Sequence, residues 1–351
     1  MLHFRSPINV LPLSYQSYNI PLTEWISILT LCLAPLVAHI FAGVPRSSYL
    51  CNNRPKWHEV ICHYNPTSIL WRYAAITDRR FRAKSWDTKD LAASNTLFWT
   101  SRGWDGSEAM VHSSIPYCTR LPEHKKVTVL SQEMVKTVIV LLQGIQAIVL
   151  LIQAIANRSD PSNIFLPLAI IGLMRLYCGL WLTEDYAYTS RQFIDQDCTY
   201  IEMSPNVTRS SLDNLMLEYS YAPPEDRFRP TSSWGSKTFR AFFLLQIVVM
   251  FTLCVPYLYL LALGDVFTLT TILVLFSYIT YVGATAMICS YYFIRGYTGT
   301  TIIPCIGATW YKVYTGIVIG LAIMLLVVSC IETRKTICGT YTSAPSDYAA
   351  C

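Results

Sequence analysis

Six long stretches of apolar residues, each about 19 to 25 residues in length, dominate the hydropathy pattern of the chain. An α-helix rises about 1.5 Å per residue, so about 20 residues cross the roughly 30 Å hydrocarbon core of a bilayer. Inside a bilayer the backbone must form its hydrogen bonds within the protein, which favours helices. The pattern therefore predicts six membrane-spanning helices, at residues 25–44, 137–156, 164–182, 241–263, 266–290 and 313–331.

Four longer polar segments complete the predicted organisation: two tails, 1–24 and 332–351, and two connections, 45–136 and 183–240. The 45–136 connection is rich in aromatic residues that can bury a large surface, including Trp57, Trp71, Trp86, Trp99 and Trp104. The 183–240 connection is acidic, and we expect it to be more extended. The predicted fold class is all-α: a polytopic helical membrane bundle of about six transmembrane helices with a small, mainly helical cytosolic domain.

Two helices are predicted inside the 45–136 segment. Asn65 followed by Pro66 is a typical helix start, with Asn as the cap and Pro at the first helical position. The residues from Pro66 to Trp86 combine an apolar arc with many basic side chains, which predicts a helix lying on an anionic membrane surface. The alternative is an amphipathic helix that packs on its own domain. A second helix is expected over 88–99.

The composition agrees with a membrane protein, because 53% of the residues are hydrophobic and only 14% are charged. A soluble domain carries about 25% charged residues. These values exclude a soluble enzyme, a disordered chain and a nucleic-acid binder. The lipid bilayer is therefore the expected partner, and no nucleic acid is.

The distribution of basic residues predicts the orientation in the membrane. Fourteen Lys and Arg residues lie near span ends on the side of 45–136 and 183–240, against four on the opposite side. Cytosolic loops carry the excess of Lys and Arg, so both connections are predicted to be cytosolic and both termini non-cytosolic. The membrane is the plasma membrane or an endomembrane. A cleaved signal peptide is the alternative interpretation of 25–44.

One full charge, Arg175, stands inside a predicted span, and such a charge must face protein or water. The preceding span carries Gln143, Gln146 and Gln153 on one arc. In an antiparallel hairpin of the two spans, Gln146 and Arg175 are expected to meet. These four residues are the candidate ligand-binding site, suited to an anionic or carbonyl-bearing ligand. The alternative is interhelical hydrogen bonding with a structural role.

Two further features are weaker candidates. Asp195 and Asp197 could hold Mg²⁺ and through it a diphosphate, although a solvated loop is the simpler interpretation and no metal is predicted. Cys338 and Cys351 both lie in the predicted non-cytosolic tail, where a disulfide between them is possible. No cofactor motif is present, and the sequence does not decide whether the protein is an enzyme.

The segments Arg54-Pro-Lys-Trp-His58, Cys62-His-Tyr-Asn-Pro66 and Trp99-Thr-Ser-Arg-Gly-Trp-Asp-Gly106 resemble uncharacterised multi-pass membrane proteins of filamentous fungi. The resemblance covers the first third of the chain. It implies a multi-pass protein and no particular activity.

The sequence thus favours a multi-pass membrane protein that accompanies or handles a hydrophobic small molecule in a lipid or specialised-metabolite pathway. Two other functions stay open: a small-solute transporter or channel, and a membrane enzyme similar to prenyltransferases or terpene cyclases.

Overall fold

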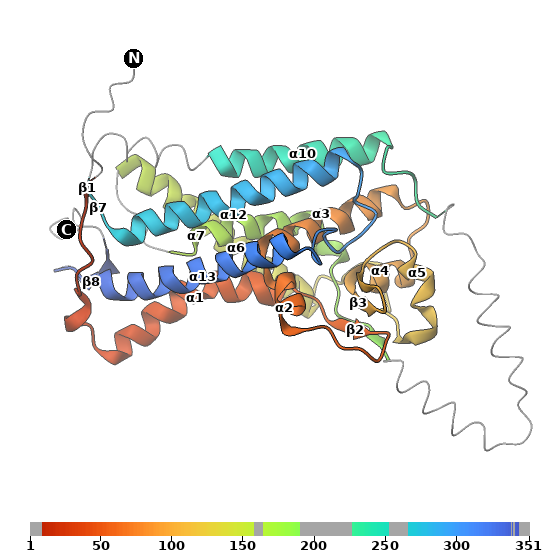
Figure 1. Ribbon diagram of the computed structural model, residues 1–351, viewed down its shortest axis with the longest axis horizontal. Helices are drawn as coiled ribbons and strands as arrows, with labels where there is room; N and C mark the ends of the chain where they lie inside the picture. Colours follow the sequence, from red (N-terminus) through yellow and green to blue (C-terminus); the bar gives the residue numbers. More distant parts are fainter. Residues whose placement is uncertain are drawn as a thin grey trace, which may run out of the picture.

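The computed structural model describes residues 9–157, 164–189, 227–252, 266–337, 339 and 341–343. Long helices lie side by side and form a bundle (Figure 1). They are α1 (Leu22–Gly43), α6 (Gln132–Asn157), α10 (Trp234–Thr252), α12 (Leu269–Ile294) and α13 (Thr309–Glu332), and the short helix α7 (Leu166–Gly172) packs with them. Within the described residues, four helical segments are long and apolar enough to cross a membrane: Leu22–Gly43, Gln132–Gln153, Leu269–Ile294 and Thr309–Glu332.

These four segments correspond to the predicted spans at 25–44, 137–156, 266–290 and 313–331. The predicted span at 164–182 is not one regular helix. Its α-helical part, α7, ends at Gly172, and the chain continues as two short 3₁₀ helices, η4 (Leu173–Tyr177) and η5 (Gly179–Trp181). A 3₁₀ segment is tighter and makes poorer hydrogen bonds, so it is used in short pieces.

The predicted span at 241–263 is covered in its first half by α10, which begins seven residues earlier, at Trp234. The first turns of α10 carry Lys237 and Arg240, and residues 253–263 lie outside the described part of the chain. The fold is therefore a helical bundle with four candidate spans, and the predicted count of six is not confirmed.

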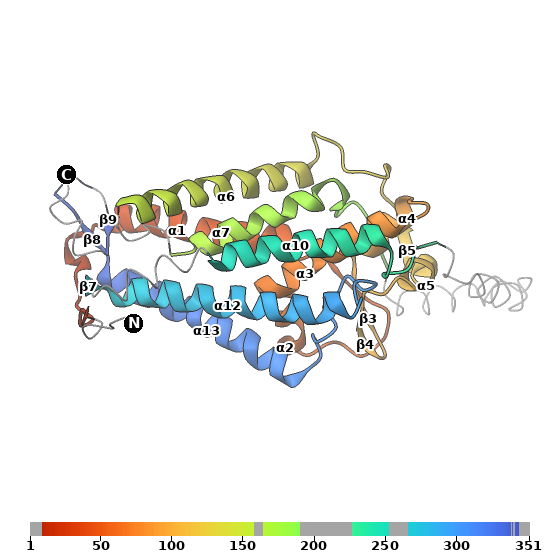
Figure 2. The same ribbon diagram turned by 90° about the horizontal axis from the view of Figure 1, so that it is seen from above.

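Short strand pairs close one end of the bundle, as Figures 1 and 2 show. Strand β1 (Asn9–Val10) runs parallel to β7 (Val266–Phe267), and β8 (Arg334–Lys335) runs antiparallel to β9 (Tyr341–Thr342). Glu24 of α1 accepts hydrogen bonds from the Lys335 Nζ and the Tyr341 hydroxyl, both at 2.6 Å. The segment that precedes α1 and the segment that follows α13 therefore lie at the same end of the bundle.

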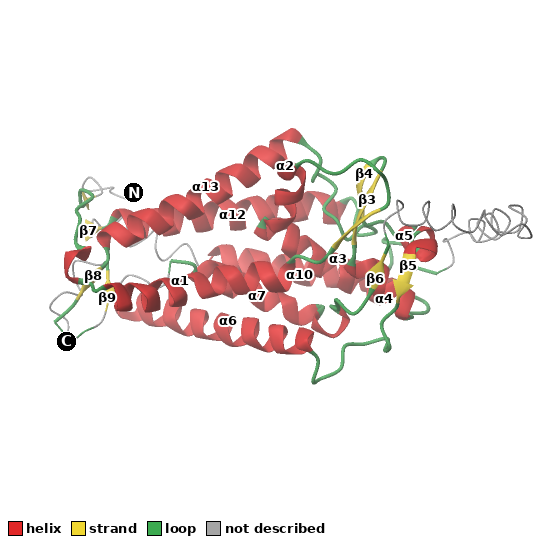
Figure 3. Ribbon diagram, turned by 90° about the horizontal axis from the view of Figure 1, so that it is seen from below, coloured by secondary structure: helices red, strands yellow, loops and turns green. Residues whose placement is uncertain are grey.

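The opposite end carries a small mixed domain, which Figure 3 shows in its secondary-structure colours. Strand β3 (Leu97–Thr100) pairs with β2 (Ser47–Tyr49) in parallel and with β4 (Gly103–Asp105) in antiparallel register. Helices α4 (Thr88–Asn95) and α5 (Met110–Ser113) lie beside this sheet, and β5 (Cys118–Arg120) pairs with β6 (Ala187–Tyr188).

The described part of the 45–136 segment is therefore ordered, as expected, but it contains a sheet as well as helices. The predicted helix at 88–99 ends at Asn95, because the next residues, Leu-Phe-Trp-Thr, form strand β3. Aromatic and β-branched residues fit a half-buried strand better than a helix. A small hydrophobic core formed by Leu50, Ala93, Phe98, Met110, Val111 and Phe228 holds the domain together.

Helix α3 (Pro66–Arg82) lies between this domain and the bundle, next to α10, α12 and η4 (Figure 2). It follows two short helices, α2 (Trp57–Val60) and η2 (Ile61–Tyr64). The predicted start is confirmed: Asn65 caps the helix by accepting from the Thr67 N–H at 2.9 Å, and Pro66 takes the first helical position.

Of the two interpretations of this helix, the one that places it on the membrane surface is wrong. Fifteen of the residues of α3 are buried, including Asp78 and the arginines Arg72, Arg79 and Arg82. These three arginines do not face lipid head groups, because each donates hydrogen bonds to acceptors inside the protein. The physical reason is that an unpaired buried charge costs far more than one with well-placed partners.

Two of these arginines bind backbone carbonyls at the ends of other segments. Arg72 donates to the carbonyl of Gly43, the last residue of α1, at 2.8 Å, and to the side chain of Asn95, the last residue of α4, at 2.9 Å. Arg79 donates to the carbonyls of Gly106 and Gly299, at 2.6 and 2.9 Å. The carbonyl end of a helix carries partial negative charge, so a guanidinium stabilises it.

Arg82 makes the ion pairs at the end of α3. Its Nε is 3.0 Å from the Asp78 carboxylate, a second nitrogen pairs with Glu108, and a third bond reaches the carbonyl of Arg229 at 3.0 Å. Asp78 also accepts from the Thr298 hydroxyl at 2.6 Å. Helix α3 therefore links segments that are far apart in the sequence.

Replacement of Arg82 by Met should lower the free energy of unfolding by about 3–5 kcal/mol, because Asp78 would stay buried without a cation. The measurement is chemical denaturation of the purified protein in detergent. Arg102 is exposed, so Arg102→Met is the matched control and should change the value by less than about 0.5 kcal/mol. Equal effects of the two substitutions would contradict the importance of this ion pair.

Candidate functional site

Arg175, the charged residue predicted inside a span, lies in η4 and is 1% exposed. Its Nε donates to the Thr137 hydroxyl of α6 at 2.9 Å, and its guanidinium pairs with Glu133 at 3.2 Å. It also donates to the backbone carbonyl of Ala42, near the end of α1. Arg175 therefore faces protein, as expected, and it joins α1, α6 and η4.

The expected pairing of Arg175 with Gln146 is not what the structure has. Arg175 lies level with Thr137, more than two turns before Gln146 on α6. Gln146 and Gln153 are exposed on the outer side of α6, and Gln143 is half-buried. The antiparallel register already differs from the predicted one along α7, where Gly172 lies against Val140 of α6. The four residues predicted as a ligand site are therefore not gathered around one point.

The remaining predicted site residues lie outside the described part of the chain: Asp195, Asp197, Cys338 and Cys351. Among the residues that the structure does describe, no group of three or more His, Cys, Asp or Glu side chains is placed to hold a metal ion.

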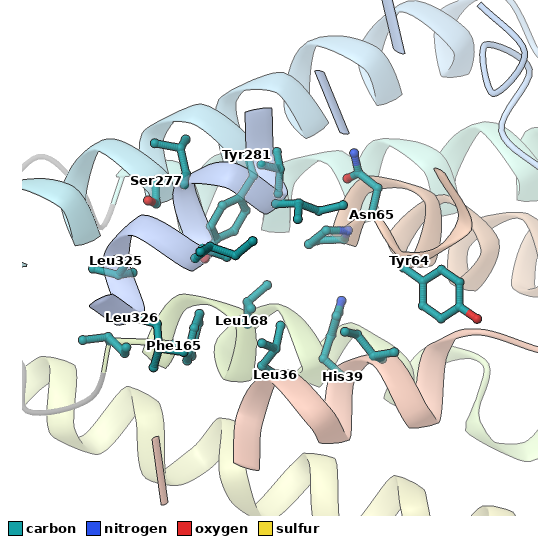
Figure 4. A pocket seen from close by; sticks show the side chains of 18 of the residues that line it. Leu36, His39, Tyr64, Asn65, Phe165, Leu168, Ser277, Tyr281, Leu325 and Leu326 are labelled. Carbon is teal, nitrogen blue, oxygen red and sulfur yellow. The ribbon is translucent and has the colours of Figure 1, made fainter. Parts of the chain in front are cut away.

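The structure instead has a large cavity between α1, α7, α12 and α13, with a volume of about 470 Å³. This volume falls within the usual range for small-molecule sites, about 300–1,000 Å³. Figure 4 shows its walls, which are mostly aliphatic and aromatic: Leu36 of α1, Leu168 of α7, Leu325 and Leu326 of α13, and Phe165, the residue that precedes α7. An apolar ligand is therefore the kind of molecule that these walls would accommodate.

One end of the cavity is polar, where α3 begins. Asn65, the cap of α3, donates from Nδ2 to the Thr315 hydroxyl of α13 at 2.9 Å. His39 of α1 projects into the cavity on the other side (Figure 4) and is 2% exposed. Neither ring nitrogen of His39 has a hydrogen-bond partner among the described residues. Ser277 of α12 lines the cavity farther from this end, and its hydroxyl also has no partner in the described part.

The cavity reaches the side of the bundle. Ile323 of α13 is one of its lining residues and is 59% exposed, while Leu33 and Leu36 of α1 line it from the neighbouring helix. An apolar cavity that opens sideways is accessible to molecules dissolved in lipid. The sequence interpretation missed this site. The available signals were His39, Ser277 and Thr315, which are polar residues inside predicted spans.

Behind the polar end lies a buried histidine outside the candidate spans. His63 of η2 packs edge-on against Trp104, with 4.4 Å between the ring centroids. Burial, together with the nearby Arg72 guanidinium, lowers the pKa of His63 to about 3. The imidazole is therefore neutral in the folded protein at physiological pH.

Comparison with protein-family models, with curated proteins and with solved structures gives no match for this chain. The resemblance to fungal multi-pass proteins stays a prediction, and the argument for function rests on the geometry of the cavity.

The pKa of His63 predicts a stability change with pH. The pKa is about 6.5 in an unfolded chain and about 3 in the folded protein, so protonation favours unfolding. Its contribution to stability is complete above about pH 6.5 and is lost as the pH falls toward 3. Lowering the pH from about 7.5 to about 5 should therefore reduce the free energy of unfolding by about 2 kcal/mol through His63 alone.

The variant His63→Phe keeps a ring against Trp104 and removes the titration. Its unfolding free energy should fall by about 2 kcal/mol less than that of the wild type over this pH change. The exposed His124 provides the control, and His124→Phe should keep the pH dependence of the wild type. Identical pH profiles for wild type and His63→Phe would contradict the prediction.

Proposed function

We propose that this chain is an integral membrane protein whose helical bundle binds a hydrophobic small molecule in the cavity between α1, α7, α12 and α13. The observation that carries the proposal is the cavity itself, with a volume of about 470 Å³, apolar walls and one polar end. Ligand pockets in proteins typically combine apolar walls with a few placed polar groups that orient the ligand.

The outer surface of the bundle supports its place in a membrane. Large apolar side chains are exposed along the helices, among them Leu31, Phe41, Leu142, Ile152 and Ile317. So many exposed large apolar side chains are unfavourable in water and favourable in lipid. The buried charges, such as Arg175 with Glu133, face the interior, where polar groups of a membrane bundle belong.

The side opening next to Ile323 supports a ligand that comes from the bilayer. A molecule with a long apolar part partitions into lipid, from which it could pass between α1 and α13 without crossing water. The transporter and the prenyltransferase-like enzyme remain hypotheses from the sequence, since no described residue favours either one. We therefore propose binding or handling of the hydrophobic molecule as the function.

Filling the cavity should abolish binding. We expect a photoreactive diazirine analogue of hexadecanol, in nanodiscs, to label the wild type in a saturable manner. The variant Leu168→Trp places a large ring in the cavity and should weaken this saturable labelling by at least about tenfold.

The control is Leu31→Trp, which adds the same ring to the exposed face of α1 and should leave the saturable labelling unchanged. Labelling of the wild type that never saturates, or that Leu168→Trp does not reduce, would contradict the proposed function.

The proposed orientation has both termini on the non-cytosolic side and the 45–136 and 183–240 connections in the cytosol. A protease site inserted after Glu123, in an exposed loop, should be cut by a protease expressed in the cytosol. The same site inserted after Ser343 should stay intact until the membrane is permeabilised. The opposite pattern of cleavage would show that the chain has the inverse orientation in the membrane.

A further inference from the structure

We infer that the polar end of the cavity recognises a neutral lipid alcohol, whose hydroxyl group is held between His39 of α1 and Asn65 at the start of α3. This inference rests on the proposed function, because it names the head group of the molecule that the cavity binds.

The first argument is the missing partner of His39. Its side chain lines the cavity and is almost completely buried, and both ring nitrogens are without a partner among the described residues. Leaving a buried polar group unpaired costs about 1–3 kcal/mol. In Figure 4 the imidazole points across the cavity toward the wall that contains Asn65. A polar group on the ligand would supply the partner that the described residues do not.

The second argument concerns charge. No Asp, Glu, Lys or Arg is among the described residues that line the cavity, and His39 is the one imidazole among them. The two nearest buried arginines are already bonded elsewhere: Arg175 to Glu133, and Arg72 to the Gly43 carbonyl and Asn95. An ionised carboxylate or phosphate would therefore enter an apolar space without a free cation, which is costly. The lining thus favours a neutral head group.

The third argument is the number of donors and acceptors. A neutral imidazole offers one N–H donor and one nitrogen acceptor. An alcohol hydroxyl likewise both donates and accepts, so it can satisfy either ring nitrogen. An ether or ester oxygen only accepts and so satisfies fewer of these groups. A hydroxyl is the smallest neutral head group that matches His39 in both roles.

The fourth argument is the position of Asn65. Its side-chain oxygen accepts from the Thr67 N–H, and its Nδ2 donates one hydrogen to Thr315. The amide Nδ2 carries a second hydrogen that these two bonds do not use. The amino end of α3, which carries partial positive charge, begins at the same point and favours an oxygen lone pair. Asn65 is thus a second polar residue that lines the cavity together with His39.

Competition against the photoreactive probe in nanodiscs tests the inference. The competitors share one chain and differ in the head group: hexadecanol, hexadecyl methyl ether, hexadecane and palmitic acid, each compared at equal mole fraction in the lipid. For the wild type we expect hexadecanol to compete at least about tenfold better than the methyl ether or the alkane, and better than the acid at pH 8.5.

Two variants of His39 assign the preference to this residue. His39→Leu should reduce the ratio of alcohol to ether to about twofold or less, while the alkane still competes. His39→Gln retains one donor and one acceptor and should keep a clear preference for the alcohol. His124→Leu, at an exposed position, should behave as the wild type. If His39→Leu does not fold, the ratios of alcohol to ether for the wild type and for His39→Gln still decide whether the cavity prefers a hydroxyl head group.

The outcomes separate the two proposals. Saturable labelling with equal competition by alcohol, ether and alkane would overturn the inference and leave the proposed function standing. Stronger competition by palmitic acid than by hexadecanol would also overturn it, in favour of an anionic head group. An absence of saturable labelling would overturn both.

Discussion

The buried position of helix α3 depends on one constraint: every charged side chain on it needs a partner inside the protein. Arg72, Arg79 and Arg82 meet this requirement with backbone carbonyls, Asn95, Asp78 and Glu108. Apart from Asp78, which belongs to α3 itself, these acceptors belong to the end of α1, the end of α4 and loops between other elements. A helix with this many charges is stable in the interior only because those segments converge on it. The mixed domain and the bundle are therefore held together by polar bonds as well as by apolar packing.

The same constraint shapes the cavity. Because α3 is held by its arginines, its first residue lies inside the bundle, where Asn65 bonds to Thr315 of α13. The space beyond it, between α1, α7, α12 and α13, is lined almost entirely by apolar side chains. Its polar lining residues include His39, Asn65, Ser277 and Thr315, and both ring nitrogens of the buried His39 lack a partner among the described residues. The contrast with α3, where the polar groups are largely satisfied, is what makes His39 informative about a ligand.

The sequence predicted the features that depend on neighbouring residues. Four predicted spans correspond to helices of suitable length, and Asn65 with Pro66 starts α3 as expected. Features that depend on distant residues were not predictable in the same way. The polar face of α3 suggested a surface helix, because its buried acceptors, such as Gly43, Gly106 and Gly299, are remote in the sequence. The register that pairs Arg175 with Thr137 instead of Gln146 depends on how α6 packs against α7 and η4, which the sequence of the two segments does not fix. The cavity lies between four helices, so it could not be predicted without the relative positions of all four.

The most direct test of the central claim is a cryo-electron microscopy structure of the full chain in lipid nanodiscs that contain hexadecanol. The account predicts elongated density inside the cavity between α1, α7, α12 and α13, with its polar end within hydrogen-bonding distance of His39. A cavity closed by its own side chains, or density confined to the outer surface of the bundle, would contradict it.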